Sequence, residues 1–219
     1  MTQFRQFDLA IEGMMGLAID VGAQVEAMVD LAVAALSGPE SEHLVKAQIR
    51  VEESCLTLEK RCNDMLALQS PRAGDLRLLI ATTRLALDLQ RVAEISIDIT
   101  RRAKPWRESA LIPPQQAQPL AELAQDMLHR AVSGFVHADP AMAKQVIQDE
   151  ARADHLARDC FNACQGLVMH NPENVAGYTH MLRTVGHIEH LIDIAVDIAE
   201  ESVYVHTGVL ARHALSGNG

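Results

Sequence analysis

The sequence predicts an all-α protein built from two tandem antiparallel three-helix bundles. Apolar residues recur with the helical spacing i, i+3, i+4 and i+7 through nearly all of the 219 residues. Aromatic residues make up only 3% of the chain, whereas β-sheets are rich in aromatic and β-branched side chains. Short breaks that contain Pro or Gly divide the periodic pattern into long segments, and the second half of the chain repeats the first.

The first two predicted helices are separated by one such break. An apolar stripe from Phe7 to Leu36 predicts the first helix, and Ser37-Gly38-Pro39 ends it because this sequence cannot continue a helix. The second helix runs from about residue 40 to residue 69. The residues of its expected apolar side are Leu44, Val45, Val51, Cys55, Leu58, Cys62, Met65 and Leu66.

A third helix is predicted from about residue 72 to residue 104, with Ser70 as its N-cap. Pro71 suits the first helical position, where a missing N–H has no cost because that donor has no partner within the helix. The helical pattern then lapses over residues 105–118, which Pro105, Pro113, Pro114 and Pro119 bracket. We expect this segment to be the linker between the two bundles.

The second half repeats this organisation with breaks at Asp139-Pro140 and Asn171-Pro172, and its last helix ends near residue 206. The expected units are therefore a first bundle (1–104), a linker (105–118), a second bundle (119–208) and a flexible tail (209–219). The repeat itself is visible in the sequence, because residues 88–99 align with residues 187–198 at a constant offset of 99. In that alignment Gln90 corresponds to Glu189, Glu94 to Asp193 and Asp98 to Asp197.

Charge and cysteine content exclude several classes of protein. The formal net charge of −10 repels nucleic acid backbones, so we expect no nucleic acid partner. No secretory leader pattern is present and no apolar run approaches the ~18 residues of a membrane span, so we expect a cytoplasmic protein without membrane insertion. The four cysteines do not form a disulfide framework, and we interpret them as reduced core thiols.

Carboxylates on the last two helices form the strongest candidate site. Glu189, Asp193, Asp197 and Glu200 follow one another on one side of the last helix, and Glu150 and Asp154 lie four residues apart on the preceding helix. Carboxylates from two antiparallel helices of one bundle can converge on a hard cation, and its binding would relieve their mutual repulsion. The candidate metal ligands are Glu150, Asp154, Glu189, Asp193 and Asp197.

Two other interpretations of these acids remain open. Charged residues at helical spacing usually form a solvated face, and Arg152 and Arg158 offer local ion pairs. The first bundle has fewer acids, because Leu56 follows Glu52 at i+4 and Gln90 precedes Glu94. We expect it to bind metal weakly or not at all.

No pattern of a catalytic site is present. The chain has no Gly-x-Ser-x-Gly turn, no Gly-rich phosphate loop and no His-Glu-x-x-His segment. Ten histidines include His187 and His190 at i, i+3, but neither belongs to a Glu-x-x-His motif, and we expect the histidines at surface or boundary positions. We therefore expect a protein that is not an enzyme.

Two segments are similar to the PhoU family of phosphate regulators. Residues 67–77 (ALQSPRAGDLR) resemble the entry to the third helix of that family, and residues 191–208 (LIDIAVDIAEESVYVHTG) resemble its closing segment. The resemblance covers about residues 7–208. It implies two tandem three-helix bundles, frequent pairing into homodimers and a role without catalysis.

The resemblance also implies partners and a metal site. Proteins of this family are thought to connect the ATPase-containing phosphate ABC transporter to a membrane-bound sensor histidine kinase, and to repress the phosphate-starvation response when phosphate is plentiful. Family members can bind metal through paired motifs of Glu or Asp, three residues, then Asp. The second bundle keeps both motifs, with Glu150 and Asp154 in one and Glu189 and Asp193 in the other. The first bundle departs from them at Leu56 and Gln90.

Asp98 and Asp197 stand where the family usually has Asn, which adds negative charge beside each site. We expect a divalent or trivalent ion (Fe, Mn, Mg or Zn) in the second bundle only. The alternative functions are a carboxylate-bundle protein that stores or oxidises iron, and a structural helical scaffold.

Overall fold

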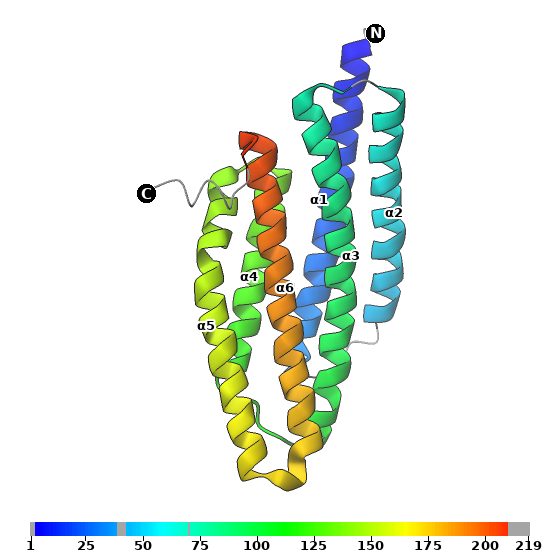
Figure 1. Ribbon diagram of the computed structural model, residues 1–219. Helices are drawn as coiled ribbons and strands as arrows, with labels where there is room; N and C mark the ends of the chain where they lie inside the picture. Colours follow the sequence, from blue (N-terminus) through cyan, green and yellow to red (C-terminus); the bar gives the residue numbers. More distant parts are fainter. Residues whose placement is uncertain (1–2, 39–42, 70, 210–219) are drawn as a thin grey trace, which may run out of the picture.

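The computed structural model, shown in Figure 1, describes residues 3–38, 43–69 and 71–209, and this part of the chain consists of helices joined by short turns and loops. The prediction of an all-α fold is confirmed, since the described residues include no strand. The elements are α1 (Gln3–Ala34), α2 (Leu44–Leu68), α3 (Ala73–Glu108), α4 (Ala117–Val136), α5 (Pro140–His170), the short 3₁₀ helix η1 (Pro172–Asn174) and α6 (Val175–Thr207).

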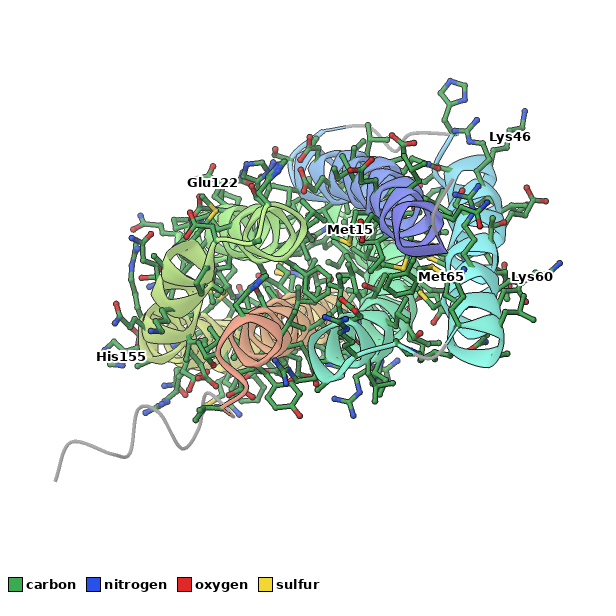
Figure 2. All side chains as sticks on the ribbon, turned by 90° about the horizontal axis from the view of Figure 1, so that it is seen from above. Met15, Lys46, Lys60, Met65, Glu122 and His155 are labelled. Atoms are coloured by element: carbon green, nitrogen blue, oxygen red, sulfur yellow. The ribbon has the colours of Figure 1, made fainter. Side chains whose placement is uncertain are left out.

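The six long helices form two three-helix bundles that lie side by side. Helices α1, α2 and α3 pack on one another, as do α4, α5 and α6. Between the bundles α3 packs against α6 and α1 packs against α4, so α2 and α5 are the outermost helices (Figures 1 and 2). In the end-on view the side chain of Met65 lies in the interior of the first bundle, whereas Lys60 and His155 point outward (Figure 2). One continuous apolar core therefore joins both halves of the molecule.

Helices α3 and α6 show the internal repeat in their burial as well as in their sequence. The buried residues Leu89 and Val92 of α3 are followed 99 positions later by the buried Ile188 and Leu191 of α6. The same spacing relates Trp106 to Val205. Each of these two helices presents an equivalent apolar side to its own bundle, so the pair forms the centre of the molecule.

Two predicted helix boundaries are wrong. Helix α3 begins at Ala73 with Arg72 as its N-cap, so Pro71 precedes the helix, and Ser70 lies outside the described residues. Helix α3 also continues through Pro105 to Glu108, four residues past the expected end. A proline removes one helical hydrogen bond and kinks the chain, but the next residue, Trp106, is only 2% exposed, and its burial favours the extra turn.

The linker is correspondingly shorter than predicted. Residues 109–116 connect α3 to α4. Pro119 lies in the first turn of α4, where a backbone N–H has no partner within the helix, so its absence costs no hydrogen bond. The break at Asp139-Pro140 has the predicted chemistry. The Asp139 side chain accepts hydrogen bonds from the backbone N–H of Ala141 and Met142, at 3.0 and 3.1 Å, and Pro140 is the first residue of α5. Of the predicted tail, residues 210–219 lie outside the described residues.

The core agrees with the predicted apolar stripes except at Val45, which is 50% exposed. All four cysteines are buried and none forms a disulfide, so the interpretation as core thiols is confirmed. Within residues 3–38, 43–69 and 71–209, no helix combines the length and apolar character that crossing a membrane requires.

Candidate functional site

The predicted metal ligands lie on the outer surface of α5 and α6. Glu189, Asp193 and Asp197 are exposed on α6, and the opposite side of this helix buries a stripe of apolar residues. Glu150 and Asp154 are exposed on α5. The carboxylates therefore face solvent, whereas the iron-oxidising bundle considered above needs carboxylates that face the bundle interior.

The structure brings acids of the two helices together at one shallow depression. Asp154 of α5 and Glu189 of α6 line it together with Arg158 and Phe161, around a volume of about 300 Å³. Arg158 brings a positive charge to the same depression, so the interpretation of these acids as members of local ion pairs stays open.

Asp193 lies near enough to this depression to be affected by its charges. Burial raises the pKa of Asp193, and the carboxylates of Asp154 and Asp197 raise it further. His190 opposes this effect from one turn earlier in α6, with 3.9 Å between its Nδ1 atom and the Asp193 Oδ2 atom. Asp154, Glu189 and Asp193 thus form the acidic face of the second bundle.

The other two predicted ligands, Glu150 and Asp197, do not line the depression of Asp154 and Glu189. Asp197 lines a different depression, next to the contact between α3 and α6, and Glu150 lines neither. Among the described residues no three Asp, Glu, His or Cys side chains assemble into a group that could hold a metal ion. The oxygen donors have the right chemistry for a hard cation, and Asp154 and Glu189 by themselves supply fewer than the six or more oxygen ligands that such ions take, so further donors or water would have to complete the set.

The corresponding face of the first bundle is largely apolar, although Glu52, the first acid of the motif, lies on it. Leu56 of α2 replaces the second acid of the motif and is 55% exposed. Val45 and Ile49 continue the same side of α2 and are 50% and 53% exposed. The first bundle therefore presents Val45, Ile49 and Leu56 as an apolar face.

A polar seam between α3 and α6 is a feature that sequence reasoning missed. At one end Arg84 of α3 forms a salt bridge with Glu201 of α6. The carboxyls of Asp88 and Asp197 line the same depression as this pair, together with Glu200. Burial and the Asp197 carboxylate raise the pKa of Asp88 to about 6, and Glu201 adds to the effect while Arg91 and Arg84 oppose it. Acids therefore predominate at this end of the seam.

Basic groups predominate at the other end. The Nε of Arg102 donates a hydrogen bond to Nε2 of His187 at 2.8 Å, so His187 accepts there as a neutral ring. Burial lowers the pKa of His187, and Arg102, His190 and Arg183 lower it further. Asp98, whose Oδ2 lies 3.9 Å from the ring, is the opposing influence.

The two ends of the seam occupy equivalent positions of the repeat. His187 follows Asp88 by 99 residues, and Asp197 follows Asp98 by the same number. Because α3 and α6 pack antiparallel, a contact between Asp98 and His187 implies an equivalent one between Asp88 and Asp197 (Figure 1). The alignment of the two halves at an offset of 99 residues relates these positions to each other. It predicts a contact between them only once the two bundles are known to pack through α3 and α6.

The nine histidines of the described residues are all exposed or half-buried, as predicted. His129 of α4 connects the bundles on the opposite side from the seam, with its Nδ1 2.9 Å from Oε2 of Glu26 in α1.

Comparison with known proteins identifies two copies of one domain. The PhoU domain matches residues 19–103 and 118–202, so each copy covers most of one bundle. The chain is 26% identical over 199 residues to the phosphate-specific transport system accessory protein PhoU homolog of Aquifex aeolicus, covering 89% of this chain and 90% of the relative. It is 24% identical over 214 residues to the homolog of the same name from Pseudomonas aeruginosa, covering 95% and 88%.

Two solved structures share the fold. The crystal structure of PhoU from Pseudomonas aeruginosa superposes with a TM-score of 0.86 at 21% identity, covering 93% of this chain and 100% of that one. The phosphate transport system regulatory protein PhoU from Streptococcus pneumoniae gives a TM-score of 0.79 at 21% identity, covering 96% and 99%. The side-by-side bundles are thus a known arrangement.

Proposed function

The chain belongs to the PhoU family, and from this premise we propose that it is a non-catalytic regulator of phosphate uptake and of the phosphate-starvation response. The observation that carries the proposal is the pair of PhoU domains at residues 19–103 and 118–202. Relatives named as accessory proteins of phosphate-specific transport match this chain over nearly all of their length, which supports the same role here. A regulator of this kind works through its surfaces.

We further propose that it contacts two partners, the ATPase subunit of a phosphate ABC transporter and a sensor histidine kinase, from the cytoplasm and as a homodimer. What supports two partners is the divergence of the two bundles. The first has the apolar face of α2 (Val45, Ile49, Leu56) and the second has the acidic face of α5 and α6 (Asp154, Glu189, Asp193). Surfaces of such different chemistry suit different partners.

Deletion of the gene tests the regulatory role. We expect a phosphate-responsive promoter to become active in phosphate-replete medium after deletion, and the intact gene to restore repression. An iron-storing protein or a passive scaffold would leave this promoter silent, and that result would refute the proposal. Light scattering of the purified chain tests the dimer, and fractionation of cells tests the location.

A pair of variants of α2 tests the apolar face. Leu56→Lys places a charge on this face, whereas Leu68→Lys changes a residue of the same helix that is 80% exposed and lies outside it. We expect Leu56→Lys to lose co-purification with one of the two partners and to keep the other, and Leu68→Lys to keep both. Retention of both partners by Leu56→Lys would exclude this face as a contact surface.

A further inference from the structure

Helices α3 and α6 lie side by side and form one long side of the molecule, with α1 and α4 behind them (Figures 1 and 2). We call the surface of α3 and α6 that carries Asp88, Arg102, Arg183 and Asp197 the seam surface. Arg183 and Asp197 are exposed on it, and Asp88 and Arg102 are half-buried. The contacts proposed above with two other proteins use α2 and the acidic face of α5 and α6, so the seam surface is left without a role.

The acidic end of the seam surface has more acids than arginines. Its depression is lined by Arg84 and by four acids, Asp88, Asp197, Glu200 and Glu201. Arg84 forms a salt bridge with Glu201, whereas Asp88 and Asp197 repel each other across the seam. Arg91 also acts on Asp88, so four acids face two arginines at this end.

The basic end of the seam surface has the opposite balance. Arg102 of α3 donates a hydrogen bond to the neutral ring of His187, and this contact does not cancel its charge. Arg183 of α6 acts on the same ring, and Asp98 is the acid that opposes the two arginines there. Two arginines therefore face one acid among the charged groups that act on His187.

The charged residues have the same spacing on both helices. Asp88 and Arg102 lie 14 residues apart on α3, and Arg183 and Asp197 lie 14 residues apart on α6. Fourteen residues make about four helical turns, so each pair lies on nearly the same side of its helix and about 21 Å apart. Because the two helices are antiparallel, both acids lie at one end and both arginines at the other (Figure 1). A rotation by 180° about an axis across the middle of the two helices therefore places each acid opposite an arginine of a second copy.

Apolar side chains accompany these charges on α3. Leu76, Ile80 and Leu87 follow one another at i, i+4 and i+11, and all three are exposed. Leu87 lines the same depression as Asp88 and Asp197. An exposed apolar stripe bordered by charges is typical of a protein–protein contact, and its burial contributes association free energy that exposed charge pairs supply poorly.

We propose that the seam surface binds a second copy of this chain in an antiparallel arrangement with two-fold symmetry. Resting on the homodimer proposed above, this assignment names the surface that forms it. Asp197 of each copy pairs with Arg183 of the other, Asp88 pairs with Arg102, and the apolar stripe of α3 becomes buried. A second copy is the partner that this pattern fits, because its two ends are equal in spacing and opposite in sign. The net charge of −10 makes two copies repel each other at long range, so close complementary pairs decide how they meet.

Charge reversals at the two exposed residues test the contact. In the proposed dimer Arg183→Glu places two acids opposite each other, and Asp197→Lys places two cations opposite each other. We expect each variant to raise the dissociation constant of the dimer about tenfold or more, measured by sedimentation equilibrium of the full-length protein with a chelator present. Arg183→Glu makes the chain more negative and Asp197→Lys makes it less negative. A general effect of net charge would therefore weaken one dimer and strengthen the other.

Two substitutions on α2 are the matched controls. Lys60→Glu and Asp64→Lys make the same charge changes at exposed positions of that helix, and Lys60 points outward (Figure 2). We expect both to keep the dissociation constant of the dimer within about threefold of the wild type, since surface charges outside a contact change affinity little. A loss of the dimer in these controls as large as in the variants of α6 would contradict the assigned contact.

The chain that carries both Arg183→Glu and Asp197→Lys should recover the dimer, because the two charges exchange places and the pairs form in the opposite sense. We expect its dissociation constant to return to within about threefold of the wild type. No recovery in this double variant, or unchanged dimers in both single variants, would overturn the assignment and leave the seam surface to a different partner. A wild type that stays monomeric would refute the homodimer together with this assignment, whereas the promoter experiment tests the regulatory role separately.

Discussion

The acidic face of the second bundle illustrates how a few carboxylates can be close without forming a site. Asp154 and Glu189 share a depression, and Asp193 is affected electrostatically by Asp154. A metal ion would need a third oxygen donor to join the first two, and Asp193 is the nearest acid that this helix offers. The metal site therefore stays a prediction, with Glu150, Asp154, Glu189, Asp193 and Asp197 as its expected ligands.

Metal content tests this prediction. We expect purified wild-type protein to retain a metal ion and the double variant Glu189→Ala with Asp193→Ala to lose it, because two of the expected donors are removed. Elemental analysis after anaerobic purification measures the ratio of metal to protein. The double variant Glu52→Ala with Glu94→Ala is the matched control in the first bundle and should keep the wild-type ratio. Equal metal content in the wild type and the second-bundle variant would contradict the assignment.

Asp88 predicts a pH dependence of stability. Its pKa is raised to about 6 in the folded chain, against an ordinary value near 3.9 in the unfolded chain. The folded state therefore binds the proton more strongly than the unfolded state does. The contribution of Asp88 to the free energy of unfolding is fully present below pH 4 and is lost as the pH rises through 6. At pH 8 the ionised carboxylate costs ~1–2 kcal/mol, because it is partly buried and lies beside Asp197 and Glu201.

Asp88→Asn tests this effect. We expect the variant to unfold at a higher denaturant concentration than the wild type at pH 8, and the difference to shrink as the pH falls to 5. Urea unfolding at both pH values, with a chelator present, gives the comparison. Asp98→Asn, at the other end of the seam in the same helix, is the control, since Asp98 is also half-buried but faces His187 and Arg102 rather than acids. If the difference in the free energy of unfolding between the wild type and Asp88→Asn is the same at pH 8 and at pH 5, the assigned cause is contradicted.

At the scale of helices, α3, α4 and α6 are each followed by a residue in the left-handed conformation. Ala110 and Ala138 adopt the left-handed conformation, with φ angles of 52° and 57°, and Gly208 does so after α6 with a φ of 71°. At the end of α4, Asp139 N–H donates to the Gly134 carbonyl at 2.8 Å, which is the long hydrogen bond of a Schellman motif. Alanine is strained in this conformation and glycine is not.

Ala138→Gly is therefore expected to stabilise the protein by about 0.5–1 kcal/mol, after the larger entropy of glycine in the unfolded chain is subtracted. Gly208→Ala should destabilise it by a similar amount. A Cβ atom at Gly208 meets only the Arg77 guanidinium, at 3.8 Å, so the penalty there is conformational and not steric. Thermal unfolding of both variants measures the two effects, and the same sign for both would refute the explanation.

These helix ends also show what the sequence can predict. The Asp139-Pro140 boundary was predictable because its signal is local, with a capping side chain and a proline in adjacent positions. The end of α3 was not, because a proline argues locally for a break, while the burial of Trp106 depends on the packing of the whole bundle. In the same way, the sequence predicted that the acids share one face of α6. That Asp197 lines a different depression from Glu189 depends on how α3 packs against α6.

At the scale of the molecule, the contact between the two bundles determines how the two copies of the repeat are joined. A linker of eight residues and a continuous core join the two copies, so they form one body with different charges at the two ends of the α3–α6 seam. Neither the sequence pattern nor the repeat register predicted this side-by-side packing, since each bundle buries its own stripes without it. The close approach of α1 and α4 on the other side allows the contact to be tested.

Gly22 is a position where α1 and α4 approach each other closely. A Cβ atom there would lie 2.7 Å from Cγ1 of Val132, a stiff β-branched side chain of α4 that cannot move aside easily. Gly22→Ala should therefore separate the two helices and destabilise the protein by about 1–3 kcal/mol.

Gly16 lies in the same helix with nothing within 4 Å of its Cβ position, so Gly16→Ala should stabilise the protein by about 0.5–1 kcal/mol through helix propensity alone. Chemical unfolding measures the change in the free energy of unfolding for both variants. The two changes have opposite signs only if the bundles pack through α1 and α4 in solution as they do here. A stabilising effect of both substitutions would mean that the first and second bundles do not touch at this point, and the polar contact of His129 with Glu26 beside it would then have no structural basis.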